Sequence, residues 1–153
     1  MKSPRVLGAC LVLSIAPLTA MTVRSTLSSR AAAARTTWDS VYSASQASRG
    51  ETTYAKTCAR CHGASLGGAD EAPALTGGSF LGNWNGLPLS DLQKRIKTTM
   101  PSDTVGVYDI QLVTDVIAFM LRANGFPAGT VDLPKDAEPL KEIMIKAGKP
   151  DGQ

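Results

Sequence analysis

Apolar residues recur at helical spacing most clearly between residues 109 and 124. An acidic residue, Asp109, starts this stretch and Gly125 follows it, as is typical of helix ends. The apolar positions lie three and four apart, at Ile110, Val113, Val116, Ile117, Met120 and Leu121. This pattern predicts an amphipathic helix from Asp109 to Asn124 that packs its apolar face into a core.

Two further stretches predict helices of moderate length. From Gln46 to Cys58 the spacing of Ala47, Gly50 and Tyr54 places them on one helical face. A second helix is predicted from Ser90, because Ser90 and Gln93 have the spacing of a capping box. This helix must end by Thr99, because a proline at position 101 disfavours helical geometry at Met100.

The rest of the chain is rich in residues that favour loops. Gly, Pro, Asn and Ser are dense from residue 63 to 88 and leave room for a short helix near Phe80–Trp84. A last short amphipathic helix is predicted around Leu140, Ile143 and Met144. No run alternates with a period of two, as a strand would. The sequence therefore predicts an all-α domain with long loops.

Composition limits the size and the partners of this domain. The 153 residues, 43% of them hydrophobic, suit one small domain with additional segments. The net charge of +3 comes from five basic residues before Asp39, since 11 basic and 13 acidic residues lie from Asp39 onward. No basic cluster marks the folded part, so nucleic-acid binding is not expected.

The N-terminus is built like an export signal. Lys2 and Arg5 precede an apolar stretch that runs from Val6 to Ala20 and ends in small residues. An uncleaved membrane anchor over residues 6–23 is the alternative, while the apolar stretch before Cys10 is too short for a lipoprotein signal. We expect a signal peptide or anchor at 1–23, a linker or processed segment at 24–37, a main domain at 38–130 and a C-terminal extension at 131–153. Export predicts a periplasmic protein.

Two cysteines and a histidine, which can bind a metal or a cofactor, lie together in residues 57–63, Thr-Cys-Ala-Arg-Cys-His-Gly. A thioredoxin-like redox pair would follow a strand, and no strand is predicted before Cys58. Structural zinc needs four ligands, and removal of the signal leaves only Cys58, Cys61 and His62 as Cys or His residues. Cys-x-x-Cys-His is the attachment sequence of haem c, in which two thiols reach two vinyl groups and the histidine faces the iron. The sequence therefore predicts one covalently attached haem c, with His62 as an iron ligand.

His62 is the single histidine, so the sixth ligand of the iron has to be methionine, lysine or water, or the position is empty. Met120 lies in the apolar stripe of a predicted helix and is expected to pack in the core. Met144 lies in the C-terminal segment, whereas Met100 follows a helix end and stands among polar residues in a loop. We therefore predict Met100 as the distal ligand, which gives an iron without an open site and favours electron transfer.

These features resemble the class I c-type cytochromes, in particular the monohaem cytochrome domains associated with bacterial quinoprotein dehydrogenases, which depend on pyrroloquinoline quinone. The resemblance covers about residues 38 to 145. The matching stretches are Ser40–Tyr42, Gln46–Gly50 with Tyr54, Cys58–Gly63, Ala72–Gly77, Phe80, Trp84, Thr99–Pro101, Ala118–Leu121 and Asn124–Gly125. This chain has Val105 before Gly106, where the family often has proline.

The resemblance implies a small cytochrome c fold in which helices and long loops surround one haem. It implies that Pro73 offers its carbonyl oxygen to the second ring nitrogen of His62. The expected wall of the haem pocket is formed by Leu75, Phe80, Trp84, Leu92 and Ile96.

The function expected is that of a periplasmic electron carrier and not of an enzyme. Redox proteins, among them a quinoprotein dehydrogenase and a terminal oxidase, are the expected partners, with membrane contact only through an uncleaved N-terminus. The alternatives are a haem subunit bound to a quinoprotein alcohol or sugar dehydrogenase, and a haem ligand sensor or peroxidase with a labile Met100.

Overall fold

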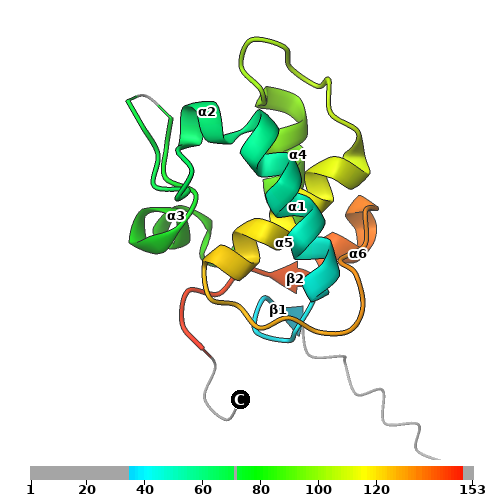
Figure 1. Cartoon of the computed structure of the whole chain (residues 1–153). Helices are drawn as coiled ribbons and strands as arrows, with labels where there is room; N and C mark the ends of the chain where they lie inside the picture. Colours follow the sequence, from blue (N-terminus) through cyan, green and yellow to red (C-terminus); the bar gives the residue numbers. More distant parts are fainter. Residues whose placement is uncertain (1–34, 71, 150–153) are drawn as a thin grey trace, which may run out of the picture. The chain divides into compact units, whose positions relative to one another are not determined.

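The computed structural model describes residues 35–70 and 72–149 of the chain. In this part, helices predominate and the strands are two residues long (Figure 1). The elements are β1 (Arg35–Thr36), α1 (Ala44–Thr57), α2 (Ala59–His62), α3 (Gly77–Trp84), α4 (Leu89–Thr99), α5 (Ile110–Ala123), α6 (Ala137–Lys141) and β2 (Ile143–Met144). The predicted all-α fold is confirmed.

Helices α1 and α5 cross and form the centre of the domain (Figure 1). The strong periodic pattern predicted α5 almost to the residue. The N-cap of α5 is Asp109, whose side chain accepts a hydrogen bond from Gln111 N at 2.7 Å. Gly50 of α1 lies at the crossing, and a Cβ atom there would approach Asp115 O to 1.8 Å. Only a residue without a side chain allows the two backbones this separation.

The core lies around this crossing and includes side chains from every helix except α2. Its largest fully buried members are Tyr42, Tyr54, Phe80, Leu89, Leu92, Ile117, Met120, Leu121, Leu133, Leu140, Ile143 and Ile145. Aromatic contact adds to the packing, since the rings of Tyr54 and Phe119 lie 5.2 Å apart. Met120 is buried on α5, as the apolar stripe predicted.

The capping box predicted at Ser90 is wrong. Helix α4 begins at Leu89 with Pro88 as its N-cap, and no side chain caps it. Gln93 Nε2 instead donates to Thr114 Oγ1 at 3.0 Å and to Lys135 O at 2.8 Å. Because Gln93 is buried, its amide must find partners inside the fold, and it joins α4 to α5 and to the C-terminal segment.

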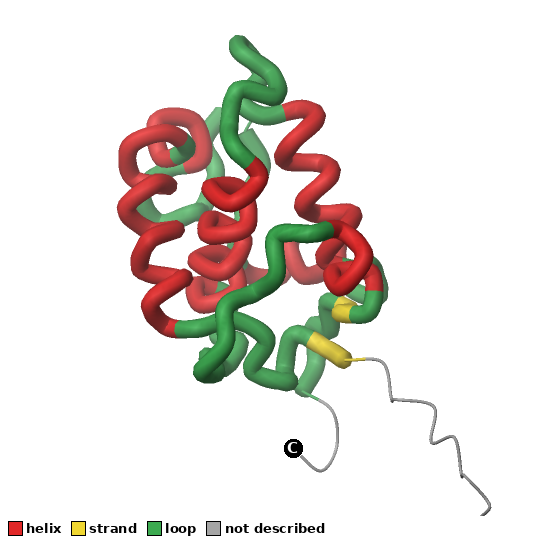
Figure 2. Tube along the Cα trace, turned by 90° about the vertical axis from the view of Figure 1, so that its right-hand side faces the viewer, coloured by secondary structure: helices red, strands yellow, loops and turns green. Residues whose placement is uncertain are grey.

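The C-terminal segment, residues 131–149, packs into the same core. The helix predicted near Leu140 is shorter than expected, because Ile143 and Met144 form β2 and pair in parallel with β1 (Figure 2). Trp38 Nε1 donates to Lys146 O at 3.0 Å, and Ile145 N donates to Leu87 O at 2.9 Å. These contacts tie the end of the domain both to its beginning and to the turn before α4.

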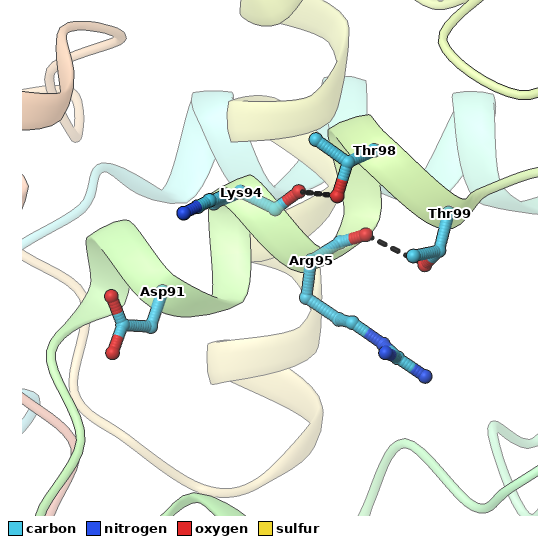
Figure 3. Close-up of a pocket in the computed structure, with 5 residues that line it drawn as sticks. All are labelled: Asp91, Lys94, Arg95, Thr98 and Thr99. Carbon is cyan, nitrogen blue, oxygen red and sulfur yellow. Dashed lines mark hydrogen bonds between the residues drawn. The ribbon is translucent and has the colours of Figure 1, made fainter.

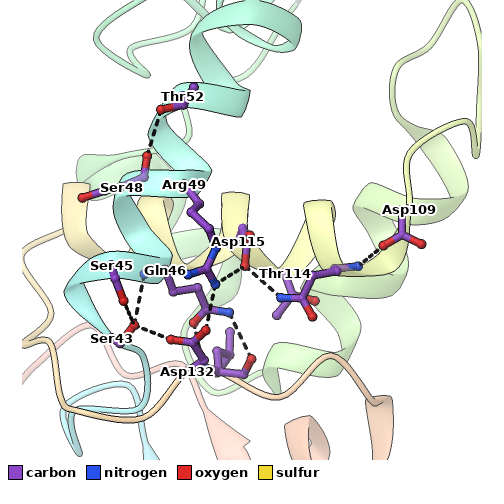
Figure 4. A network of polar contacts seen from close by, with 12 residues as sticks. Ser43, Ser45, Gln46, Ser48, Arg49, Thr52, Asp109, Thr114, Asp115 and Asp132 are labelled. Carbon is purple, nitrogen blue, oxygen red and sulfur yellow. Dashed lines mark hydrogen bonds and ion pairs between the residues drawn. The ribbon is translucent and has the colours of Figure 1, made fainter.

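A polar network fixes the segment that leads to α6 (Figure 4). Arg49 donates to Asp115 at 3.0 Å and to Asp132 at 2.7 Å. Asp132 also accepts a hydrogen bond from Ser43 Oγ, which, together with Arg49, holds the pKa of this carboxyl below its usual value. Gln46 exchanges two hydrogen bonds with the backbone of Leu133. The network joins α1, α5 and the C-terminal segment.

The predicted signal peptide or anchor at 1–23 and residues 24–34 of the predicted linker at 24–37 lie outside the described residues, whereas Arg35 and Thr36 form β1. In the part of the chain that the structure describes, no helix has the length and apolar content needed to cross a membrane.

Candidate functional site

One short helical turn carries both cysteines and the histidine. Cys58 ends α1, donating its N–H to Tyr54 O at 2.9 Å, and also serves as the N-cap of α2. Its carbonyl accepts from Cys61 N at 3.1 Å and from His62 N at 3.0 Å. Both thiols are free, and burial raises the pKa of the Cys58 thiol. The segment therefore presents two cysteine side chains that form no disulfide, and an imidazole, within one turn of helix.

His62 is buried and its ring is held by a neighbouring loop. Its Nδ1 lies 2.9 Å from Pro73 O, the contact that the family resemblance implies. A carbonyl oxygen only accepts hydrogen bonds, so Nδ1 carries the proton and the lone pair of Nε2 remains for a metal. Such a contact fixes the orientation of a ligating imidazole and increases its basicity.

The loop between His62 and α3 is shaped by its own backbone contacts. Gly68 N donates to His62 O at 2.9 Å, and Leu75 N donates to Leu66 O at 2.8 Å. Tyr54 OH reaches from α1 to Gly63 O at 2.7 Å. Leu66 is buried in this loop, a position that the sequence did not single out because glycines and polar residues surround it. Together these contacts hold Pro73 beside the imidazole.

Met100 lies where α4 ends and a loop begins. Its N–H donates to Ile96 O at 2.9 Å, and its side chain is half-buried. Lys97 of α4 reaches over the loop and donates from Nζ to Gly106 O at 2.8 Å and to Tyr108 O. Sequence reasoning missed Lys97, because its basic residue type predicted only an exposed last helical turn.

The five predicted wall residues all belong to the core or pack against it. Phe80 and Leu92 are buried, and Leu75, Trp84 and Ile96 are half-buried beside the core. The rings of Phe80 and Trp84 lie 6.3 Å apart. Their contact with a cofactor remains a prediction.

The structure bears on the zinc and redox-pair hypotheses, and it argues against the second. Within the described residues, no group of three or more Cys, His, Asp or Glu side chains is arranged to hold a metal ion. A helix precedes Cys58, where a thioredoxin-like site would have a strand. A buried imidazole beside two free thiols in the Cys-x-x-Cys-His pattern fits haem c.

A hollow of about 320 Å³ lies on the surface of α4 (Figure 3). Its lining comes from one helix and consists of Asp91, Lys94, Arg95, Thr98 and Thr99. The two threonines donate to the carbonyl oxygens of Lys94 and Arg95. Such a polar lining does not suit a porphyrin.

Comparison with known proteins agrees with the motif. Residues 45–120 match the family model described as cytochrome C oxidase, cbb3-type, subunit III. These residues are a class I c-type cytochrome domain, and the family binds covalently attached haem c. The domain therefore serves haem-based electron transfer.

One solved structure and the curated proteins complete the comparison. The chain is similar to a chain of the sulfane dehydrogenase SoxCD from Paracoccus pantotrophus, with 21% identity and a TM-score of 0.47. The similarity covers 70% of this chain and 61% of that chain. No curated protein matches the sequence.

Burial of the Tyr54 hydroxyl predicts a pH dependence of stability. Burial raises the pKa of Tyr54 from 10.0 to about 12, so the unfolded chain loses this proton first. The contribution of neutral Tyr54 to the free energy of unfolding is therefore fully present below pH 10. It declines as the pH rises toward 12, by at most about 1.4 kcal/mol per pH unit. We expect Tyr54→Phe to flatten the decline while losing one hydrogen bond at neutral pH. Urea unfolding followed by circular dichroism at pH 8 and 11 checks this, and an equal decline in both proteins would contradict it.

Proposed function

We propose that the protein is a periplasmic monohaem c-type cytochrome that carries single electrons between redox proteins. One observation carries the proposal. His62 is buried on the helical turn that bears Cys58 and Cys61, and its Nδ1 is held by Pro73 O from the following loop. The N-terminal pattern of Lys2 and Arg5 followed by apolar residues supports export, and haem attachment in bacteria takes place outside the cytoplasm.

Different residues of this chain would attach a haem c, ligate its iron and orient the ligand. Cys58 and Cys61 would each add a thiol across one vinyl group, the S–H hydrogen passing to the vinyl carbon, so no oxidant is needed. His62 would ligate through Nε2 while Pro73 O keeps the ring in place. Once bound, the haem supplies an iron that exchanges one electron at a time.

Met100 is the proposed distal ligand. It lies in a loop rather than in the core, and the contacts of Lys97 hold that loop close to α4. Met120, by contrast, is 1% exposed and is surrounded by core side chains. With His62 and Met100 as its ligands the iron would have no open position, and methionine in place of a second histidine would raise its reduction potential. This arrangement favours transfer of electrons over binding of a substrate.

The proposed pocket wall consists of apolar side chains that would exclude water from the porphyrin. These are Leu75, Phe80, Trp84, Leu92 and Ile96. A hydrophobic surrounding raises the potential of a haem by disfavouring the charged oxidised iron.

The proposed partners are redox proteins, with a quinoprotein dehydrogenase as candidate donor and a terminal oxidase as candidate acceptor. A free C-terminal segment could attach the domain permanently to an enzyme, but residues 131–149 bury Leu140, Ile143 and Ile145 in the core of this domain. The packing of this segment favours a carrier whose contacts with partners are brief and small in area.

Carbon monoxide distinguishes a carrier from a sensor or peroxidase. Full-length protein is produced with haem-attachment machinery, reduced, and mixed with carbon monoxide at neutral pH. If His62 and Met100 both ligate the iron, no position is open to carbon monoxide, so we expect no rapid change of the absorption spectrum. We also expect the colour to stay with the protein in acidified organic solvent. A change within the mixing time would support the sensor or peroxidase, and extraction of the colour would refute covalent attachment.

A further inference from the structure

An exposed ion pair joins the cysteine motif to the loop that follows Met100. Arg60 lies between the two cysteines, and Asp103 lies three residues beyond Met100. Arg60 Nη2 donates to Asp103 Oδ2 at 2.5 Å, although 43 residues separate the two. The side chains are 59% and 54% exposed, so the core does not force them together.

The other polar contacts described for residues 101–108 stay within this loop or return to α4. Thr104 N donates to Pro101 O at 3.1 Å, and Gly106 N donates to Met100 O at 3.4 Å. Lys97 then holds the far end of the loop through Gly106 O and Tyr108 O. These contacts shape the loop and fasten it to its own helix. Among the described residues, the polar contact that fastens it to the opposite segment is the one between Arg60 and Asp103.

We propose that Arg60 and Asp103 are positioning residues that keep the Met100 loop closed against the segment Cys58–His62. The inference rests on the proposed function, in which Met100 is the distal ligand. Displacement of Met100 from the iron would require the loop to move, and movement of the loop away from Cys58–His62 would separate Arg60 from Asp103. The pair thus makes opening of the loop less favourable without touching the iron or the methionine.

The expected size of the effect follows from the exposure of the pair. Exposed ion pairs change an equilibrium by a factor of about two to five at most, because water and side-chain entropy offset the attraction. Salt at about 1 M reduces the Debye length to about 3 Å and weakens such pairs further. The contribution of Arg60 and Asp103 should therefore be measurable at low ionic strength and small at high ionic strength.

The test uses imidazole as an external ligand that competes with the methionine. Oxidised, haem-loaded full-length protein is mixed with increasing imidazole in a stopped-flow instrument, and the rate at saturation reports opening of the loop. We expect Asp103→Asn and Arg60→Gln each to raise this rate about two- to fivefold at low ionic strength. We also expect the double variant Arg60→Asp/Asp103→Arg to return toward the wild-type rate.

Glu51→Gln is the matched control. Glu51 pairs with Arg122 at 2.7 Å and is 57% exposed, but this pair joins α1 to α5 and does not involve the loop. The control should leave the saturating rate unchanged, whereas a general loss of stability would change it in all variants. Unchanged rates in Asp103→Asn and Arg60→Gln, or an equal change in Glu51→Gln, would overturn the inference.

Met100→Ala separates a failure of this inference from a failure of the proposed function. If Met100 is the ligand, Met100→Ala binds imidazole without the slow opening step and lacks the far-red absorption band of an iron–thioether bond. If it behaves like the wild type instead, the distal ligand is misassigned, and the inference about Arg60 and Asp103 falls with it. If it behaves as expected but Asp103→Asn matches the wild type, only the inference fails.

Discussion

Replacing Gly50 by alanine is expected to destabilise the fold severely. The new Cβ atom would lie 1.8 Å from Asp115 O and 2.5 Å from Asp115 C, far inside contact distance. Both atoms belong to the backbone of α5, so α1 and α5 would have to move apart. Overpacking of a core costs about 1–3 kcal/mol and more where backbone must shift, so we expect about 3 kcal/mol or more in the free energy of unfolding.

Gly82→Ala is the matched control, because Gly82 also lies inside a helix, on α3. An ideal Cβ atom at Gly82 meets no atom within 4 Å. Alanine in a helix is favoured over glycine by about 0.5–1 kcal/mol, so this variant should be as stable as the wild type or more stable. Urea unfolding followed by circular dichroism measures both variants. A Gly50→Ala protein with wild-type stability would mean that the two helices do not cross as closely as described.

Features set by neighbouring residues could be predicted from the sequence. The periodic apolar stripe predicted α5, and the proline after Met100 predicted the end of α4 at Thr99. The cysteine motif likewise needs only five consecutive residues. Each of these signals acts within one or two helical turns, where spacing alone decides the geometry.

Features that depend on distant residues could not be predicted in this way. Ser90 and Gln93 have the spacing of a capping box, yet burial gives the Gln93 amide partners on α5 and in the C-terminal segment. Pairing with β1 turns Ile143 and Met144 from a predicted helix into a strand. Arg60 and Asp103 are 43 positions apart in the sequence, and nothing in the sequence pattern indicates that they pair.

The contact between Pro73 and His62 came from the family resemblance and not from the spacing of the two residues. Eleven residues separate them, and glycine-rich sequence between them allows many loop shapes. The loop is fixed by Tyr54 from α1 and by backbone bonds such as Leu75 N to Leu66 O. The contact between Pro73 and His62 therefore depends on the fold of the whole loop and cannot be predicted from the local sequence pattern.

Met100→Ala is expected to have the largest effect on the haem iron. Under the proposed ligation, loss of the thioether would open one position on the iron to water or an added ligand, so the far-red band of the oxidised protein should disappear. The reduced variant should bind carbon monoxide within the mixing time, unlike the wild type. Its reduction potential should fall, by about 0.1 V or more, because axial ligands set haem potentials over a range of about 0.8 V.

Met120→Leu is the control that distinguishes ligation from packing. Met120 is 1% exposed on α5, and leucine has a similar volume, so this change should cost less than about 1.5 kcal/mol of stability. The band and the resistance to carbon monoxide should both persist. If Met120→Leu removed the band while Met100→Ala kept it, the thioether on the iron would come from the core helix α5. The loop after α4 would then have no part in ligation, and Lys97, Arg60 and Asp103 would not position a ligand of the iron.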